Sequence, residues 1–474
     1  MFSSVDERAK TDRRVRMPVR ERIADVRRVL FPTRWAWAVA LCVCVLAPSL
    51  LVTLQIDANP KFSPFDEVAH LDYVERVSRG EVPRQGERVL ETSLREISCN
   101  GYQGESFDLP PCGAPVGSGQ TSLTWTQHEA QQPPTYYALT VPLRWATHNV
   151  LGIDGDLRAT RTSSIAWLVA GLMLLWAAGR AMGIRPLALG AALLVLGASP
   201  WIVYLAGTVS NDVTAVPAAG LVALAGAIAY RRPGPSWAGW LFAAGFVASA
   251  LKTTNVFATA AVAALFAVAV LSERGQGEPT SVVARRWLRN GGALLAGGLA
   301  ATLIWTVVHH SIALIAVADD PALDSLRQGP RAAGVVLKAA ASLVWPLTGD
   351  PGAGVVRHFS PGTLGHDLQL PFYALLACAP IAVGLSALFV SPRRWPHALG
   401  LISLALLCVG GLVLAVGFMV LYDQDPDPSA RYGISLAPLL MLALAASLVG
   451  RWARWGTAAF AAALFLTMLG SMTV

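Results

Sequence analysis

Residues 397–421 read HALGLISLALLCVGGLVLAVGFMVL, a run without a single Asp, Glu, Lys or Arg. As a helix this run would be about 37 Å long, enough to cross the roughly 30 Å hydrocarbon core of a bilayer. Comparable runs recur along the whole chain, in which 54% of the 474 residues are hydrophobic and only 14% are charged. This composition excludes a water-soluble globular protein and predicts an all-α polytopic membrane protein.

The chain contains about eleven such apolar runs, which we predict to be transmembrane helices. They lie near residues 34–56, 160–182, 186–206, 212–230, 236–251, 253–271, 291–317, 369–390, 397–421, 432–450 and 455–473. Arg clusters between the runs predict the orientation, because short cytoplasmic loops are enriched in Lys and Arg. With alternate crossings, all of the clusters fall on the side of the basic N-terminal segment: Arg180 and Arg185; Arg231 and Arg232; Arg285, Arg286 and Arg289; Arg393 and Arg394; Arg451 and Arg454.

This arrangement predicts how the chain is organised around the bilayer. A basic cytoplasmic tail (1–34) precedes a single transmembrane domain (35–474), which includes a large first extracytoplasmic loop with interfacial helices (57–159) and a second outer loop (318–368). The segment 133–151 is apolar but short and contains basic residues, so we expect an interfacial helix rather than a crossing. We expect a multi-pass protein of the bacterial inner membrane with a cytoplasmic N-terminus, in close contact with membrane lipid.

The net charge of +7 follows from this topology and does not predict a nucleic-acid partner. Motifs of P-loop nucleotide sites, dinucleotide sites, CxxC redox sites and HExxH zinc sites are missing from the sequence. Two of the six cysteines, Cys99 and Cys112, lie in the first outer loop, where an oxidising compartment would allow a disulfide; two free thiols are the alternative. The other four lie in apolar runs and are expected to be inert.

The first motif with chemical potential is Phe65-Asp66-Glu67-Val68-Ala69-His70, shortly after the first apolar run. On a short interfacial helix Asp66 and His70 share one face. Next to the membrane, the low dielectric would raise the pKa of Asp66, which suits a general base acting on a hydroxyl. The alternative is that the two acids only complement the start of a helix.

The second motif is the run Gln127-His128-Glu129-Ala130-Gln131-Gln132-Pro133-Pro134-Thr135-Tyr136-Tyr137. Its two prolines fix an extended backbone just before an apolar segment. We therefore expect His128, Glu129 and Gln132 to lie at the same depth as Asp66. A structural role, with prolines starting a helix and tyrosines forming an aromatic belt, explains the prolines but not the His-Glu pair.

Shorter polar motifs stand at the start of later apolar runs, on the predicted outer side of the membrane. Asn211 and Asp212 follow Ser210 in a motif that is also typical of simple N-capping. Lys252 lies between two runs, where it can snorkel or hold an anion. Arg431-Tyr432 opens another run, and the planar guanidinium of Arg431 suits a phosphate or pyrophosphate headgroup. The alternative is a salt bridge of Arg431 to one of three nearby acids, Asp423, Asp425 and Asp427. The oxygen atoms of these acids also suit calcium or magnesium.

Together these motifs resemble the GT-C superfamily of polyprenyl-phosphate-dependent glycosyltransferases, and more specifically the bacterial membrane family called domain of unknown function 2142. The resemblance spans about residues 35–450. It rests on the acidic pair after the first helix, the large first outer loop, the Gln-Pro-Pro-x-Tyr-Tyr segment and the Arg431-Tyr432 pair. A common family form of the last motif is Gly-Arg-Tyr, whereas Ala430 precedes Arg431 here, which loosens the match.

The resemblance implies transfer of one sugar from a polyprenyl-phosphate donor to an extracytoplasmic hydroxyl of a cell-envelope glycan, lipid or protein. It implies that Asp66 is the catalytic base, with Glu67 as its neighbour or a metal ligand. No metal site is assigned, and a divalent cation (Mg, Mn or Ca) is the only cofactor considered. The other candidate residues would bind donor or acceptor: His70, His128, Glu129, Gln132, Tyr136, Asn211, Asp212, Lys252, Arg431 and Tyr432.

Other classes of function share this membrane frame. A lipid-linked oligosaccharide ligase or polymerase would usually have a large late outer loop, whereas the first loop is larger here. A transporter or flippase of lipid-linked sugars would place charged residues deep in the spans, whereas this sequence places them at the outer rim. An inactive scaffold for envelope assembly would tolerate replacement of Asp66.

Overall fold

The structure is a computed structural model that describes residues 33–103, 110–114, 126–231, 237–273, 280–316, 319, 336–337, 341–348, 363–390, 395–421 and 430–472. Every regular element in these ranges is a helix, and the only β contacts described are the isolated bridges Phe62–Tyr102 and Arg88–Thr126. The all-α class predicted from the sequence is therefore confirmed. Nearly all of the tail (1–34) and most of the second outer loop (318–368) lie outside the described residues.

The first membrane helix is continuous through α3 (Arg34–Leu41), a π-helical turn (Cys42–Leu46) and α4 (Ala47–Ala58). The segment predicted as the first outer loop (57–159) contains α5 (Glu67–Ser78), α6 (Glu91–Asn100) and α7 (Thr135–Asn149). The later helices follow in order: α8 (Asp156–Ala181), α9 (Pro186–Gly197), α10 (Pro200–Ala206), α11 (Ala215–Arg231), α12 (Trp237–Leu251), α13 (Val256–Glu273), α14 (Thr280–Ile312), α17 (Thr363–Val390), α18 (Trp395–Leu421), α19 (Ala437–Ser447) and α20 (Arg451–Met472).

Eight helical segments of the described chain are long and apolar enough to cross a bilayer: Arg34–Ala58, Asp156–Ala181, Asn211–Arg231, Thr253–Val270, Ser281–Ile312, His397–Gly417, Ala430–Ser447 and Arg451–Met472. The pair α9 and α10, bent by 63° at the break before Pro200, makes nine if it counts as one span. Shorter apolar helices cover Trp237–Leu251 and Pro371–Ser386. A multi-pass membrane protein is confirmed, while the number of eleven crossings stays a prediction.

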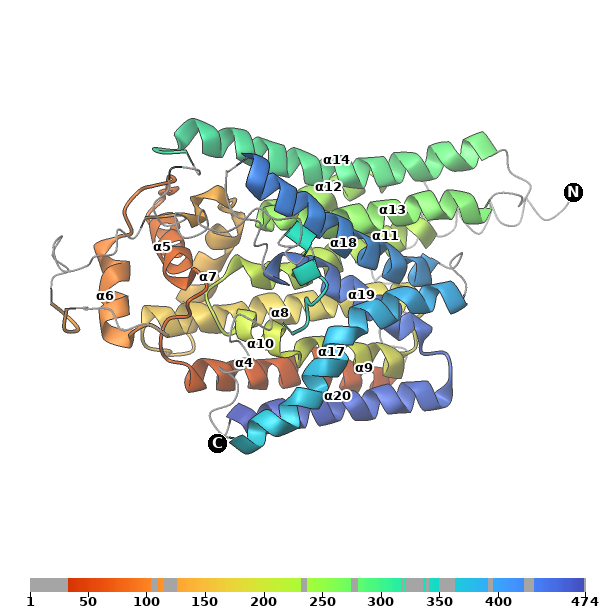
Figure 1. Cartoon of the computed structure of the whole chain (residues 1–474), viewed down its shortest axis with the longest axis horizontal. Coiled ribbons are helices and arrows are strands. Elements are labelled where there is room, and N and C mark those ends of the chain that lie inside the picture. Colours follow the sequence, from red (N-terminus) through yellow and green to blue (C-terminus); the bar gives the residue numbers. More distant parts are fainter. Residues whose placement is uncertain are drawn as a thin grey trace, which may run out of the picture.

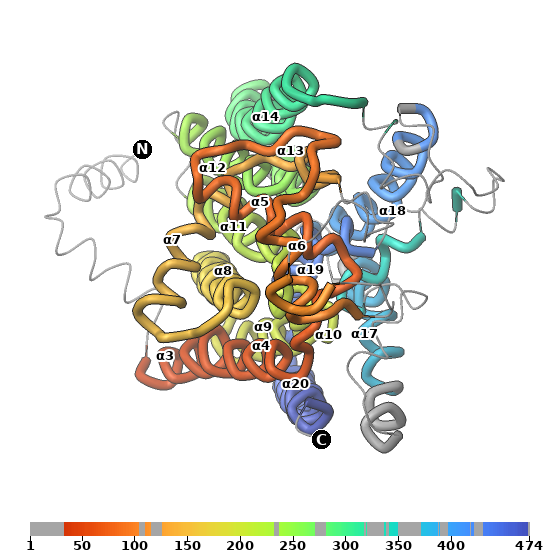
Figure 2. Tube along the Cα trace, turned by 90° about the vertical axis from the view of Figure 1, so that its left-hand side faces the viewer, coloured from red at the N-terminus to blue at the C-terminus, as the bar shows by residue number. Residues whose placement is uncertain are grey.

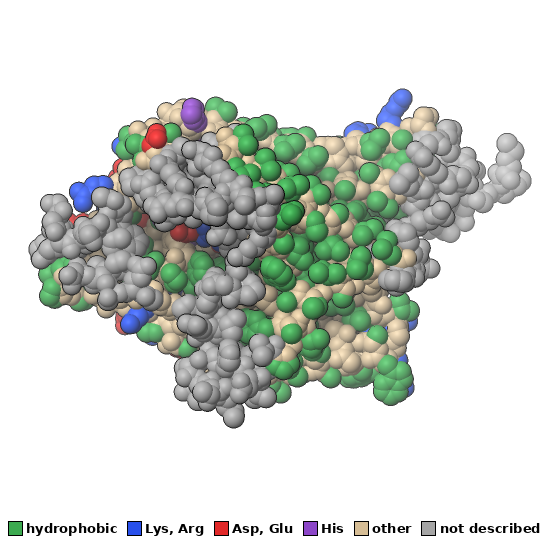
Figure 3. All heavy atoms as spheres, in the orientation of Figure 1, with side chains coloured by type: hydrophobic (Ala, Val, Ile, Leu, Met, Phe, Trp, Pro, Cys, Tyr) green, Lys and Arg blue, Asp and Glu red, His purple; other side chains and the backbone are tan. Residues whose placement is uncertain are grey.

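The long helices lie side by side along the long axis of the molecule, and α5, α6 and α7 gather at one end of the bundle (Figure 1). Figure 2 looks onto that end, with α5 and α6 in front of the long helices. On the face drawn in Figure 3, hydrophobic side chains cover the middle of the bundle and the coloured charged side chains lie towards its ends. The segment 133–151 forms α7, which is not among the candidate spans of the described chain.

Glycines allow the closest helix contacts, as expected where helices pack in a membrane. A Cβ atom on Gly297 of α14 would lie 2.0 Å from the carbonyl oxygen of Phe242 on α12, and one on Gly245 would lie 2.2 Å from that of Leu294. Helices α12 and α14 thus meet backbone to backbone.

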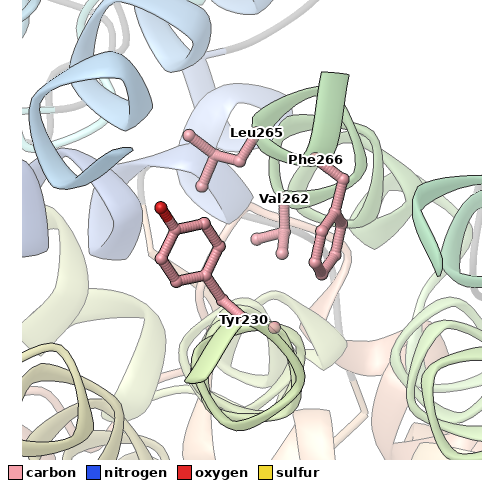
Figure 4. Close-up of a pocket in the computed structure, with 5 residues that line it drawn as sticks. Tyr230, Val262, Leu265 and Phe266 are labelled. Carbon is pink, nitrogen blue, oxygen red and sulfur yellow. The ribbon is translucent and has the colours of Figure 1, made fainter. Parts of the chain in front are cut away.

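Helices α11 and α13 pack less completely. Between them, Tyr230 and the side chains of Val262, Leu265 and Phe266 surround a crevice of about 10 Å³ (Figure 4). That volume has room for no more than a water molecule, so this crevice is a packing defect rather than a ligand site.

Cys99, near the end of α6, forms a disulfide with Cys112 across 13 residues of sequence, with Cα atoms 4.4 Å apart. This is the pairing that the sequence allowed for the two cysteines of the first outer loop. Disulfides persist in oxidising compartments, so the bond agrees with an extracytoplasmic position of this loop.

Candidate functional site

The site is built around the start of α5, where Asp66 is the residue before the first helical turn. Its φ of 58° is the only positive value for a non-glycine residue in the described part of the chain. Aspartate and asparagine adopt this left-handed conformation more readily than other side chains, yet it is still unfavourable. Backbone strain of this kind persists only where surrounding contacts hold it, and it is concentrated at functional positions.

Glu67 supplies the contacts that hold the start of α5. Its fully buried carboxylate accepts hydrogen bonds from Nε and Nη2 of Arg161 at 2.7 and 2.6 Å, and from the backbone amides of Ser63 and Val209, each at 2.7 Å. Arg161, on α8, also donates to the carbonyl oxygens of Asn59 and Lys61. With four donors on one carboxylate, the geometry does not fit Glu67 as a base or metal ligand and instead makes it an anchor beside Asp66.

A second buried network fixes the His128 segment against α5. The side-chain amide of Gln127 donates to the carbonyl oxygen of Ala69 at 2.9 Å and to Oδ2 of Asp72 at 2.8 Å. Asp72 also accepts hydrogen bonds from Nε of Arg76 and from the backbone amide of Leu90. The loop that carries His128 is therefore held in a defined register on α5.

The central contacts of the site converge on the Asp66 carboxylate. Its Oδ1 lies 3.1 Å from Nε2 of His128, and its Oδ2 accepts a hydrogen bond from Nη1 of Arg431 at 2.5 Å, from a residue 365 positions later in the chain. The side chains of Asp66, His128 and Arg431 keep 26%, 14% and 18% of their surface exposed. The Asp66 carboxylate is therefore paired with both cationic side chains, and all three groups stay partly exposed.

These contacts set the charge of the groups that lie outside the membrane spans. Burial acts to raise the pKa of Asp66, but the positive charges of Arg431 and His128 outweigh it and hold that pKa well below its usual range. Burial likewise opposes the charged form of His128, but the Asp66 carboxylate outweighs it and raises the pKa of His128 to about 9. The sequence-based expectation of a raised Asp66 pKa is wrong, because it took account of the low dielectric and not of the paired cations.

His70 and Glu129 lie next to each other in the same cluster as Asp66. Nδ1 of His70 is 2.9 Å from the hydroxyl oxygen of Tyr137 and 3.8 Å from Oε2 of Glu129. Burial lowers the pKa of His70 despite the negative charges of Glu129 and Asp66, so the ring is neutral near pH 7. The Glu129 side chain is only 6% exposed, and its carboxylate accepts no hydrogen bond from the described residues.

A second acid–base pair completes the cluster. Asp212 Oδ1 accepts a hydrogen bond from Nζ of Lys252, and its Oδ2 accepts one from the Ser210 hydroxyl at 3.0 Å. The ring of Tyr432 lies between the cations, 5.9 Å from Nζ of Lys252 and 5.4 Å from Cζ of Arg431. Such cation–aromatic contacts hold positive groups in place without neutralising them.

Most of the predicted residues therefore meet in one cluster. Asn211 reaches the Tyr137 hydroxyl at a donor–acceptor distance of 3.5 Å, and Gln132 accepts a hydrogen bond from Thr253 at 3.4 Å. Tyr136 does not reach the cluster, because it packs against Trp167 and the neighbouring Tyr137. Tyr137 is the tyrosine that touches His70.

The sequence analysis gave no role to three residues that support the site: Arg161, Asp72 and Gln127. Arg161 left a usable signal, since a buried arginine at the end of an apolar run requires an acidic partner. Asp72 and Gln127 left none, because ordinary loops and amphipathic helices contain such residues.

No family model and no curated protein matches this chain. The resemblance to the GT-C glycosyltransferases therefore stays a prediction from motifs.

The donor set also bears on a metal ion. Asp66, His128 and Glu129 each offer one ligand atom, and these atoms lie within 4.8 Å of one another. A carboxylate and imidazole set fits Mn²⁺ or a similar divalent cation. Because the pKa of His128 is raised to about 9, an ion bound there near pH 7 would have to displace its proton. The alternative ligands Asp423, Asp425 and Asp427 lie outside the described residues.

Proposed function

We propose that this protein is a membrane glycosyltransferase that moves a sugar from a polyprenyl-phosphate donor to an acceptor hydroxyl on the extracytoplasmic side of the bacterial inner membrane. The proposal takes the eleven apolar runs as eleven crossings, with the N-terminus in the cytoplasm and the α5–α7 end of the bundle outside. Acceptors in this compartment are cell-envelope glycans, lipids or proteins.

The observation that carries the proposal is the convergence of Asp66 and Arg431, far apart in the sequence, in a partly exposed pair beside the buried pair of Asp212 and Lys252. A fold needs no such cluster for stability, since pairs of buried charges contribute little compared with apolar packing. A reaction that develops negative charge on a leaving phosphate does need fixed cations beside a carboxylate base.

The pairing gives each group a role. A donor phosphate competes with Asp66 for Arg431 and with Asp212 for Lys252, because phosphate accepts bidentate hydrogen bonds from guanidinium. Once Arg431 turns to the phosphate, the pKa of Asp66 rises towards that of a useful base. Asp66 would thus become an effective base only in the donor-bound protein.

The step itself needs one base. Asp66 takes the proton of the acceptor hydroxyl while the acceptor oxygen forms a bond to the anomeric carbon. The bond from that carbon to the phosphate oxygen breaks, and its electron pair leaves with the polyprenyl phosphate, whose charge Arg431 and Lys252 hold. A phosphate leaving group needs little protonation, so no separate strong acid is required.

Glu129 is the rival base within the same proposal. Its buried carboxylate accepts no hydrogen bond from the described residues, whereas Asp66 is already paired. Both carboxylates lie beside His128, so an acceptor hydroxyl could give its proton to either one.

The test compares wild-type, Asp66→Asn and Glu129→Gln proteins reconstituted in lipid vesicles. Transfer of radiolabelled sugar is measured from a panel of polyprenyl-phosphate donors to envelope acceptors, and donor binding is measured separately. Asparagine is chosen at position 66 because it tolerates the left-handed backbone. Glu91→Gln, on the exposed surface of α6, is the matched control.

If Asp66 is the base, Asp66→Asn lowers kcat by a hundredfold or more with donor binding retained, and Glu129→Gln does so less. The reverse order would move the base to Glu129. A third result would contradict the proposal: folded wild-type protein transfers no sugar from any donor but moves labelled donor across the vesicle membrane. That result would indicate a flippase.

A further inference from the structure

A second candidate site lies at the other end of the bundle. A cavity of about 250 Å³ is bounded by the turn between α8 and α9, including Arg185, and by the region where α19 gives way to α20, including Leu448 and Arg454. The turn follows Arg161 by about 20 residues of α8, which corresponds to about 30 Å along a helix. The cavity is therefore separate from the Asp66 cluster.

The cavity is positively charged. Arg185 and Arg454 line it, and neither guanidinium has a hydrogen bond or ion pair with another described side chain. The lining segments 182–188 and 445–454 contain no Asp or Glu. His397 also lines the cavity and is oriented by a contact of 3.1 Å between its Nδ1 and the Ser447 hydroxyl.

The start of α9 adds to this charge. Arg185 is the residue before its first turn, Pro186 opens the helix, and no acidic side chain caps it. The first amides of a helix have no partner within it and carry a partial positive charge. Ala188, in this first turn, lines the cavity itself. The turn thus brings the positive end of a helix and a guanidinium to the same space, a combination that favours a phosphate.

The neighbouring surface places the cavity at the level of lipid headgroups. Trp452 and Trp455, at the start of α20, are 82% and 53% exposed, and Val449, which lines the cavity, is 69% exposed. Tryptophan is enriched where a membrane protein crosses the bilayer–water interface. The remaining wall is apolar, including Ala445 and Leu448.

We propose that this cavity binds the phosphodiester headgroup of an anionic phospholipid from the leaflet opposite the Asp66 cluster. The two guanidinium groups and the start of α9 would hold the phosphate, and the apolar wall beside the exposed tryptophans would contact the glycerol and first acyl carbons. A bound headgroup would join the α8–α9 turn to the α19–α20 junction. The site is independent of the sugar-transfer reaction.

The test uses the purified full-length protein in detergent, with defined lipids as probes. Native mass spectrometry counts retained lipids, and thermal melting reports stabilisation by phosphatidylglycerol against phosphatidylcholine and inorganic phosphate. Arg185→Gln and Arg454→Gln remove one guanidinium each, and Arg454→Lys retains the charge. Arg285→Gln, an exposed arginine of α14 that does not line the cavity, is the matched control.

The proposal predicts that phosphatidylglycerol binds and stabilises wild type and Arg285→Gln alike, and that each glutamine variant at the cavity weakens binding about fivefold. Arg454→Lys should recover most of the loss. Equal binding by all variants, or equal binding of phosphatidylcholine, would overturn the site. Stabilisation by inorganic phosphate as strong as by lipid would overturn the lipid as occupant. Retained lipid is also counted in unheated samples, so a variant of lower stability is still informative.

Discussion

The role of Glu67 gives the sharpest test of how the site is held. The perturbation is Glu67→Gln, compared with Arg161→Met and with the double variant. If Glu67 were a base or a metal ligand, its replacement would reduce activity and leave stability unchanged. If it anchors α5, the loss appears in stability first and in activity only through the displaced Asp66.

The magnitude follows from the contacts of the pair. Arg161 is 2% exposed and Glu67 is fully buried, and two of the four donors to Glu67 come from Arg161. Removing one partner of such a buried pair costs about 3–5 kcal/mol, because the other charge is left uncompensated. The double variant should cost less than the sum of the single variants, since it leaves no charge behind.

The assay is thermal unfolding of the detergent-solubilised protein, followed by tryptophan fluorescence. We expect each single variant to lower the melting temperature by roughly 3–5 °C, since the unfolding entropy of a chain of this length is about 1 kcal/mol/K. Glu91→Gln, at the exposed pair with Arg95, should change it very little, since surface ion pairs contribute about 0–1 kcal/mol. A Glu67→Gln protein that melts with the wild type, or single effects that simply add, would refute the anchoring role.

The remaining predictions concern charge, packing and the disulfide. Because the pKa of His128 is raised to about 9, its stabilising contribution is full below its unfolded pKa of about 6.5 and is lost as pH rises through 9. Melting curves recorded between pH 6 and pH 10 should show a loss of about 3 kcal/mol of stability for the wild type and no such loss for His128→Gln. In the same melting assay, Gly297→Leu should lower the stability by about 3 kcal/mol or more, because the added side chain would overlap the backbone of Phe242. Gly292→Ala should leave the stability unchanged, since no atom lies within 4 Å of the added Cβ. Alkylation of the denatured, unreduced protein should label four thiols and leave Cys99 and Cys112 unlabelled.

Much of the fold was predictable because each element is decided locally. Apolar runs of about 20 residues can only be buried or span a membrane, so the all-α class and most helix positions follow from composition. The break before Pro200 in the third run also had a local signal, since a proline ends the preceding helix. The 63° bend between α9 and α10 did not, because neighbouring helices set it.

The site was predictable in its members and not in its pairings. Acids and cations at the outer ends of apolar runs indicated Asp66, Lys252 and Arg431 one by one. Which cation contacts Asp66 depends on how the last helices pack against the first loop. The predicted pKa of Asp66 was wrong because the sequence did not show this pairing. Tyr136 was preferred to Tyr137 for a related reason, since one residue turns a helical side chain by about 100° and the sequence does not fix that phase.

The contact between Asp66 and Arg431 also bears on how the protein is made. Membrane helices enter the bilayer in the order of synthesis, so α5 is in place while the chain from α8 onwards is still being made. Asp66 therefore lacks the guanidinium of Arg431 until the segment that begins at Ala430 has inserted. An unfinished or truncated chain therefore holds an incomplete cluster outside the membrane, and any activity of the cluster begins only when synthesis is nearly complete.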